Sequence, residues 1–171
     1  MAVSSEPTET AGVARAYFEA VGRRDLDAME ACFEAGATDE IHGLAALTVP
    51  GTFRAWFTNL FEAFPDFQFE ILDVLATGEK AAVRWRARGT FTGGAKFEGL
   101  EANGASVDVQ GCDVLTIRSG LIHRNDAYMN GAEMARQLGA LPPVGSVAEK
   151  AAVALANLKT RLRDLVASRR G

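Results

Sequence analysis

A change of hydrophobic period at Pro65 constrains the fold of this chain more than any other feature. Before Pro65, apolar residues recur three and four residues apart, which is the spacing of helices with one buried face. After it, apolar and polar residues alternate, as in strands that bury one face. The residue before a proline avoids the helical region, so a helix should end here. This order predicts an α+β fold, with helices first and an antiparallel sheet second.

Three helices are expected before the proline. They cover residues 11–25, 25–37 and 52–64. Asp25 is placed to cap the second helix, and Gly36 is placed to end it. The third has the clearest pattern, because one stripe carries Phe53, Trp56, Phe57, Leu60, Phe61 and Phe64. That stripe is mainly core, although part of it can line a pocket.

Four strands are expected after the proline, at residues 67–76, 81–92, 105–118 and 121–129. The second separates its faces cleanly. Val83, Trp85 and Ala87 share one face, and Arg84, Arg86 and Arg88 share the other. We expect three N-terminal helices to cover one face of a curved antiparallel sheet, which leaves a cone-shaped ligand pocket.

The chain divides into three expected parts. Residues 1–9 are a predicted disordered leader, residues 10–140 the folded domain, and residues 141–171 a helical extension. In the extension, apolar side chains step by four and three residues, at Ala151, Leu155, Leu158, Leu162 and Leu165. This spacing predicts a C-terminal helix that packs on its own domain or on a neighbouring subunit.

Composition excludes several classes of protein. The 171 residues carry a net charge of −4, which gives no reason to expect a nucleic-acid partner. No apolar run approaches the roughly 20 residues of a membrane helix, so we expect no membrane association, and the N-terminus does not resemble a secretory signal. Cys32 and Cys112 form no metal or redox motif, so we expect reduced cysteines in a cytoplasmic protein.

The usual catalytic motifs are missing from the sequence. It has no P-loop, no dinucleotide fingerprint and no G-x-S-x-G nucleophile elbow. The two histidines, His42 and His123, join no cluster with zinc-ligand spacing. We therefore expect no metal and no cofactor, and proton transfer by carboxylates and a histidine remains as the chemistry to consider.

Asp126 is the most informative candidate for that chemistry. In the stretch LIHRNDAYM, strict alternation puts Arg124, Asp126 and Tyr128 on one face of a strand, and Asp113 lies on the apolar face of the strand before it. A carboxyl group in such surroundings has a raised pKa. The alternatives are that Asp113 bonds backbone at a bulge beside Gly111, and that a bulge turns Asp126 to solvent. His42 lies in a polar connection, where a surface or structural role is the plainer interpretation.

Three stretches together resemble a known family. FPDF, VRWRARGT and the ending D-x-Y-x-N are similar to the SnoaL-like polyketide cyclases, over roughly residues 10–140. These cyclases belong to the nuclear transport factor 2-like superfamily, with ketosteroid isomerase and limonene epoxide hydrolase. The resemblance implies a cone of helices and a curved sheet, in agreement with the periodicity.

The resemblance also implies roles for individual residues. In the cyclases an acid on the last strand is the general acid/base of an intramolecular aldol closure, and Asp126 matches that position. His42 matches a polar pocket residue more loosely and is expected to assist it. The remaining expected substrate contacts are Tyr17, Trp56, Trp85, Asp113 and Tyr128. Epoxide hydrolases carry an Arg and an Asp two residues apart on the second strand, where Trp85 and Ala87 stand here, which argues against that activity.

We therefore expect a cofactor-independent lyase or isomerase of SnoaL type with an apolar small-molecule substrate. The alternatives are a non-catalytic binding protein for an apolar small molecule and a structural oligomerisation module. The arginine face of the second strand, in a family that commonly dimerises through its sheet, predicts a homodimer.

Overall fold

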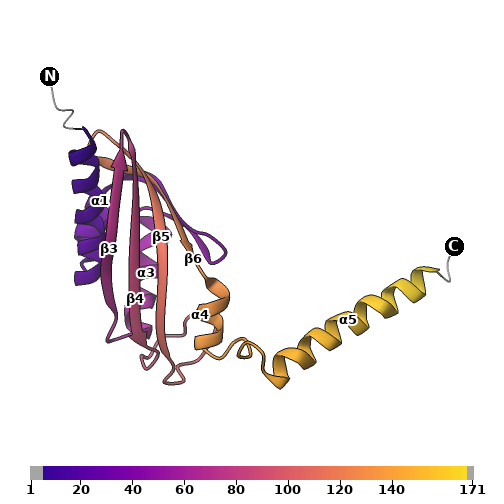
Figure 1. Cartoon of the computed structure of the whole chain (residues 1–171). Helices are drawn as coiled ribbons and strands as arrows, with labels where there is room; N and C mark the ends of the chain where they lie inside the picture. Colours follow the sequence, from indigo (N-terminus) through magenta and orange to yellow (C-terminus); the bar gives the residue numbers. More distant parts are fainter. Residues whose placement is uncertain (1–5, 169–171) are drawn as a thin grey trace.

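A computed structural model describes residues 6–168 (Figure 1). Its elements, in chain order, are α1 (Glu6–Arg23), α2 (Leu26–Ala31), β1 (Phe33–Ile41), β2 (Ala45–Thr48), α3 (Gly51–Ala63), β3 (Gln68–Thr77), β4 (Lys80–Thr90), β5 (Ser106–Arg118), β6 (Leu121–Met129), α4 (Gly131–Gln137) and α5 (Val147–Ser168).

One curved, unclosed sheet organises the domain. Its six strands lie in the order β2-β1-β6-β5-β4-β3. β3 to β6 form an antiparallel meander, as the alternation after Pro65 predicted. Figure 1 shows α1 and α3 on the same side of this sheet. The predicted α+β cone is confirmed.

The sheet is larger than the sequence indicated, because β1 and β2 were not expected. The second helix was predicted to reach Gly36, but it ends at Ala31, and Phe33 begins β1. β1 runs parallel to β6, with Phe33 beside Ile122. The expectation of a purely antiparallel sheet of four strands was therefore wrong. Phe33 fits the helical stripe of α2, but it is buried in the sheet, and tertiary packing overrides such a local pattern.

The core lies between the helices and the concave face of the sheet. Tyr17 and Phe18 of α1 and Phe53 of α3 are buried there. The faces of β4 separate as predicted, since Val83, Trp85 and Ala87 are buried, whereas Arg84, Arg86 and Arg88 lie on the outer face. On that face Arg86 pairs with Asp108, and Arg88 pairs with Glu70.

The ends of the domain differ from the expected boundaries. α1 begins at Glu6, so residues 6–9 of the predicted leader are helical, and residues 1–5 lie outside the described part of the chain. None of the helices between residues 6 and 168 combines the length and the apolar character that a membrane span requires.

The C-terminal extension forms the expected helix but does not pack on its own domain as proposed. Figure 1 shows α5 pointing away from the body of the protein. Its first turn is tied to α4 by the pair between Arg136 and Glu149. Further along, Leu155, Leu158 and Leu162 are 52–54% exposed. The apolar seam is thus open, which leaves a neighbouring subunit as the predicted partner.

We predict that this seam holds two copies of the chain together. Replacing Leu155 and Leu158 with lysine should shift sedimentation from about two chain masses towards one, because charge at a helix seam opposes association. The domain should keep its unfolding temperature, since α5 contributes little to the core. Lysine at Asn157 and Thr160, on the opposite face, is the matched control. An unchanged dissociation constant, also after deletion of residues 146–171, would show that α5 is dispensable for assembly.

Candidate active site

A cavity of about 100 Å³ lies between α1, α3 and the concave face of the sheet. Its walls are almost wholly apolar. The aromatic contributors are Tyr17, Phe18, Trp56, Phe57, Phe64, Phe67, Phe69, Trp85 and Phe97. Two carboxyl groups, Asp39 of β1 and Asp113 of β5, also line it. The sequence predicted two acids, Asp113 and Asp126, at an apolar cavity. The structure places Asp113 there, together with Asp39 instead of Asp126.

A hydrogen-bond network joins the two acids. Asn125 of β6 donates through Nδ2 to Asp39 Oδ1 at 3.0 Å and to Asp113 Oδ2 at 2.7 Å. The second oxygen of Asp39 accepts from the Tyr17 hydroxyl at 3.2 Å. Asp39, Asp113 and Asn125 are each at most 4% exposed. Register explains their meeting, because β6 lies between β1 and β5, and Asn125 is directly beside Asp39.

The second oxygen of Asp113 is held by Trp85, whose Nε1 donates to it at 2.6 Å. The indole reaches Asp113 by lying across Gly111, its cross-strand neighbour on β5. A Cβ atom added at Gly111 would overlap the Trp85 ring. A glycine on the inward face of a strand is thus required for the close approach of this side chain. The predicted bulge beside Gly111 is not seen, since the β4–β5 register runs through it without a shift.

Burial changes the acidity of both carboxyl groups. Loss of hydration raises the pKa of Asp39 to about 6, although Asn125 and Tyr17 donate hydrogen bonds that favour its charged form. The same cause raises the pKa of Asp113 to about 7, against the donors Asn125 and Trp85. Both values lie near neutrality, which is the range that suits general acids and bases.

Asn125 has a free acceptor at the centre of the network. Its Oδ1 is buried and accepts no hydrogen bond from any described residue. Because its amide nitrogen donates to both acids, Asn125 separates the two carboxyl groups instead of letting them share one proton directly. The result is two acids on one cavity wall with raised pKa values, so that one can be protonated while the other is ionised.

The expectation that Asp126 faces the cavity was wrong. A register shift in the β5–β6 pairing leaves one extra residue between Ile122 and Arg124. Such a bulge reverses the faces of everything after it. Asn125 therefore points inward, and Asp126 lies on the outer face. There Arg124 donates to both of its oxygens, at 2.6 and 2.9 Å, and holds the pKa of Asp126 below its usual value.

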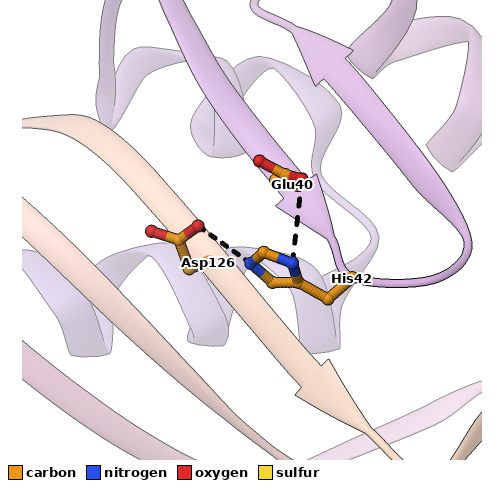
Figure 2. A group of neighbouring side chains, drawn as sticks. All are labelled: Glu40, His42 and Asp126. Carbon is orange, nitrogen blue, oxygen red and sulfur yellow. Dashed lines mark hydrogen bonds and ion pairs between the residues drawn. The ribbon is translucent and has the colours of Figure 1, made fainter.

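The expected partners of Asp126 share its outer face. His42 lies 3.0 Å from Asp126 through Nε2, so the anticipated pair forms, but outside the cavity (Figure 2). Tyr128 stacks on the His42 ring at a centroid distance of 4.4 Å and is 49% exposed. These three residues do not line the cavity, so the structure does not bring them to Asp113 as predicted.

Glu40, His42 and Asp126 are also the one group among residues 6–168 with metal-ligand atoms close together, all within 4.8 Å (Figure 2). Arg124 already donates to both carboxylates of this group. Its guanidinium supplies the positive charge that a metal would otherwise bring. The donor set therefore fits an ion-pair network at the sheet surface better than a metal centre.

The other predicted substrate contacts do lie at the cavity. Tyr17, Trp56, Trp85 and Asp113 all line it. Asp39 was missed because its segment was assigned to a helix and a connection. A signal was present, since Ala37, Asp39 and Ile41 alternate with polar residues and are all buried.

Comparison with known protein families gives a match over most of the domain. The sequence matches the profile of the SnoaL-like domain over residues 14–125. A search of curated proteins found no match.

Solved structures share the fold at low identity. AclR, a candidate hydroxylase from Streptomyces galilaeus, is 20% identical, with a TM-score of 0.70 over 92% of this chain and 98% of its own. A candidate SnoaL-like polyketide cyclase from Jannaschia sp. CCS1 is 21% identical, with a TM-score of 0.72 over 83% and 99%. An epoxide hydrolase of M. tuberculosis, described as LEH-like, is 17% identical, with a TM-score of 0.61 over 79% and 92%.

Gly111→Ala should destabilise the protein by about 1–3 kcal/mol, the usual cost of overpacking a core. The added methyl group displaces the Trp85 ring and removes the hydrogen bond to Asp113. Urea unfolding followed by tryptophan fluorescence measures the change. Gly94→Ala, where an added Cβ meets open space, is the matched control. Equal stability of Gly111→Ala and wild type would contradict the required close approach.

The buried acids predict that stability falls as pH rises. Since their pKa values are raised in the folded state, the folded protein holds protons that the unfolded chain releases, and this stabilisation is lost as pH passes through about 6 and about 7. Between pH 5 and pH 8 the free energy of unfolding should fall less in Asp113→Asn than in the wild type, by on the order of 2–3 kcal/mol. Chemical unfolding at both pH values tests this, with the exposed Asp108→Asn as control. An undiminished loss in Asp113→Asn would show that Asp113 is ionised throughout.

Proposed function

Because the chain belongs to the SnoaL-like domain family, we propose that it is a cofactor-independent cyclase or isomerase that moves a proton next to a carbonyl group of an apolar small molecule. The observation that carries this proposal is the pair of buried acids, Asp39 and Asp113, on the wall of an apolar cavity. Their raised pKa values suit the two halves of an enolisation, since one can accept a proton while the other donates a hydrogen bond.

Asp39 is the proposed base. Its carboxylate takes a proton from the carbon beside the substrate carbonyl. The electron pair of that C–H bond moves to the carbonyl oxygen and forms an enolate. The Tyr17 hydroxyl donates a hydrogen bond to the second oxygen of Asp39 and so fixes the orientation of the carboxylate.

Asp113 is the proposed donor. In its neutral form it donates a hydrogen bond to the enolate oxygen, where negative charge develops. For an aldol closure, the enolate carbon then attacks a second carbonyl carbon of the same molecule and forms the C–C bond. The resulting alkoxide regains a proton from Asp39, so the protein ends in its starting state. For an isomerisation, Asp39 returns the proton to a different carbon.

Two further observations limit the type of reaction and the catalytic residues that we propose. Trp85 and Ala87 occupy the inward positions of β4, where epoxide hydrolases need an arginine and an aspartate, so activation of water for epoxide opening is not proposed. The outward position and ion pairing of Asp126 also favour Asp39 and Asp113 as the acid/base groups.

We also propose that the chain works as a homodimer in the cytoplasm. Cys32 and Cys112 are both free, which suits a reducing compartment. In Figure 1 neither α1 nor α3 covers the outer face of the sheet, which leaves that face and the seam of α5 for a second copy.

Exchange of α-protons for deuterium in 2-pentanone, followed by proton NMR, tests the proposed chemistry. We expect a bell-shaped pH profile with its maximum between about 6 and about 7, because Asp39 must be ionised and Asp113 protonated. Asp39→Asn should lower the rate at least ~100-fold. Asp113→Asn should remove the fall in the exchange rate at higher pH, since the asparagine amide donates a hydrogen bond at every pH.

Asp126→Asn is the matched control, and its rate should stay within about twofold of wild type. Equal rates in wild type and Asp39→Asn would overturn the assignment of the base. Ketone binding without any exchange in the wild type would favour the second candidate function, a non-catalytic binding protein for an apolar small molecule.

A further inference from the structure

The cavity that holds the two acids is small for a substrate. Its volume is about 100 Å³, less than the roughly 150 Å³ of an engineered cavity that binds benzene. Ligand pockets for larger molecules usually measure about 300–1,000 Å³. The inner cavity alone therefore accommodates the reacting end of a molecule and little more.

A second hollow of about 290 Å³ adjoins it. This outer groove is formed by the turn after β1, the loop around residue 98, and α4. Most of its lining is apolar, with Leu44, Leu100, Met129, Met134, Ala135, Leu138 and Ala140. His42 and Glu98 supply its charged or polar side chains.

Three side chains separate the two spaces. Leu44, Met129 and Met134 line both the inner cavity and the outer groove. All three are only partly buried, and Met134 comes from the short helix α4. Methionine is unbranched and changes rotamer at little cost. A partition of this kind can yield to a ligand without any movement of the sheet.

The opposite polar ends of the two spaces suggest how a ligand lies. Asp39 and Asp113 are in the inner cavity. In the outer groove, Glu98 accepts a hydrogen bond from Trp56 Nε1 at 3.2 Å, and this contact links a residue of each space. His42 is 35% exposed there, held by Asp126. Between these ends the path is apolar.

We propose that the inner cavity and the outer groove take one elongated, largely apolar keto compound. Its reacting carbonyl lies at Asp39 and Asp113, its chain passes Leu44, Met129 and Met134, and its far end lies beside His42 and Glu98. Together the two spaces offer about 390 Å³, the sum of about 100 and about 290 Å³, which falls within the usual range for ligand sites. This inference rests on the proposed function for the position of the carbonyl.

The affinities of n-alkan-2-ones, from 2-pentanone to 2-undecanone, test the proposal by calorimetry. Each added CH₂ group should tighten binding about fourfold, because it enters an apolar space. The increase should continue past the length that the inner cavity holds. Affinity that levels off before 2-heptanone in the wild-type protein would overturn the proposal.

Gly131→Trp fills the outer groove alone. Gly131 lines that groove, and a Cβ atom added there meets open space. We expect 2-undecanone to bind at least ~10-fold more weakly, since several CH₂ contacts are lost, while 2-pentanone binds within about twofold of wild type. Gly94→Trp, an exposed position outside both spaces with equal room, is the matched control. Unchanged binding of 2-undecanone in Gly131→Trp would contradict a shared ligand.

The same variants separate this inference from the proposed function. Deuterium exchange in 2-pentanone should be as fast in Gly94→Trp as in the wild type, because Gly94 lies outside both spaces. If affinity increases with ketone chain length but no deuterium exchange is seen, the catalytic proposal alone is contradicted. If deuterium exchange is normal but affinity does not increase with ketone chain length, only the proposal of a shared ligand is contradicted. If no ketone of the series binds at its solubility limit, both fail.

Discussion

The rest of the site depends on the two hydrogen bonds that the buried amide of Asn125 donates to Asp39 and Asp113. Two carboxyl groups in an apolar cavity cost several kcal/mol if they are charged and unpaired. Asn125 donates to both, and Tyr17 and Trp85 satisfy their remaining oxygens. Each donor needs its own support. β1 must lie parallel to β6 to bring Asp39 beside Asn125, and Gly111 must lack a side chain to let Trp85 reach Asp113.

The bulge in β6 places the polar residues of that strand on two opposite faces of the sheet. It turns Asn125 inward and leaves Arg124 and Asp126 on the outer face. The outer group is partly exposed and ion-paired, with Arg124 joined to Glu40 and Asp126. The inner group is buried, and burial raises the pKa values of its acids to about 6 and about 7. Solvent exposure and charge partners, not residue type, thus decide which aspartates can exchange protons near pH 7.

The shape of the cone explains how one fold can serve different reactions. The neighbouring solved structures carry names of cyclases, a hydroxylase and an epoxide hydrolase at identities of 17–24%. They share the sheet and helices, whereas chemistry depends on the few polar side chains that enter the cavity. In this chain those include Asp39, Asp113 and Tyr17. The adjoining groove is where, in our proposal, the far end of the ligand binds.

The sequence alone determined the fold class, the helices α1 and α3, the meander from β3 to β6, and the inward face of β4. These follow from the hydrophobic period, which reflects local geometry and burial on one face. It also indicated Asp113, Trp85, Trp56 and Tyr17 as cavity residues. Only the tertiary structure decided that β1 is a strand and that Asn125, not Asp126, points inward. β1 is a strand because it pairs with residues of β6 more than 80 positions away. The inward position of Asn125 depends on the bulge in the β5–β6 pairing, where one extra residue reverses a face without changing the alternation of the sequence.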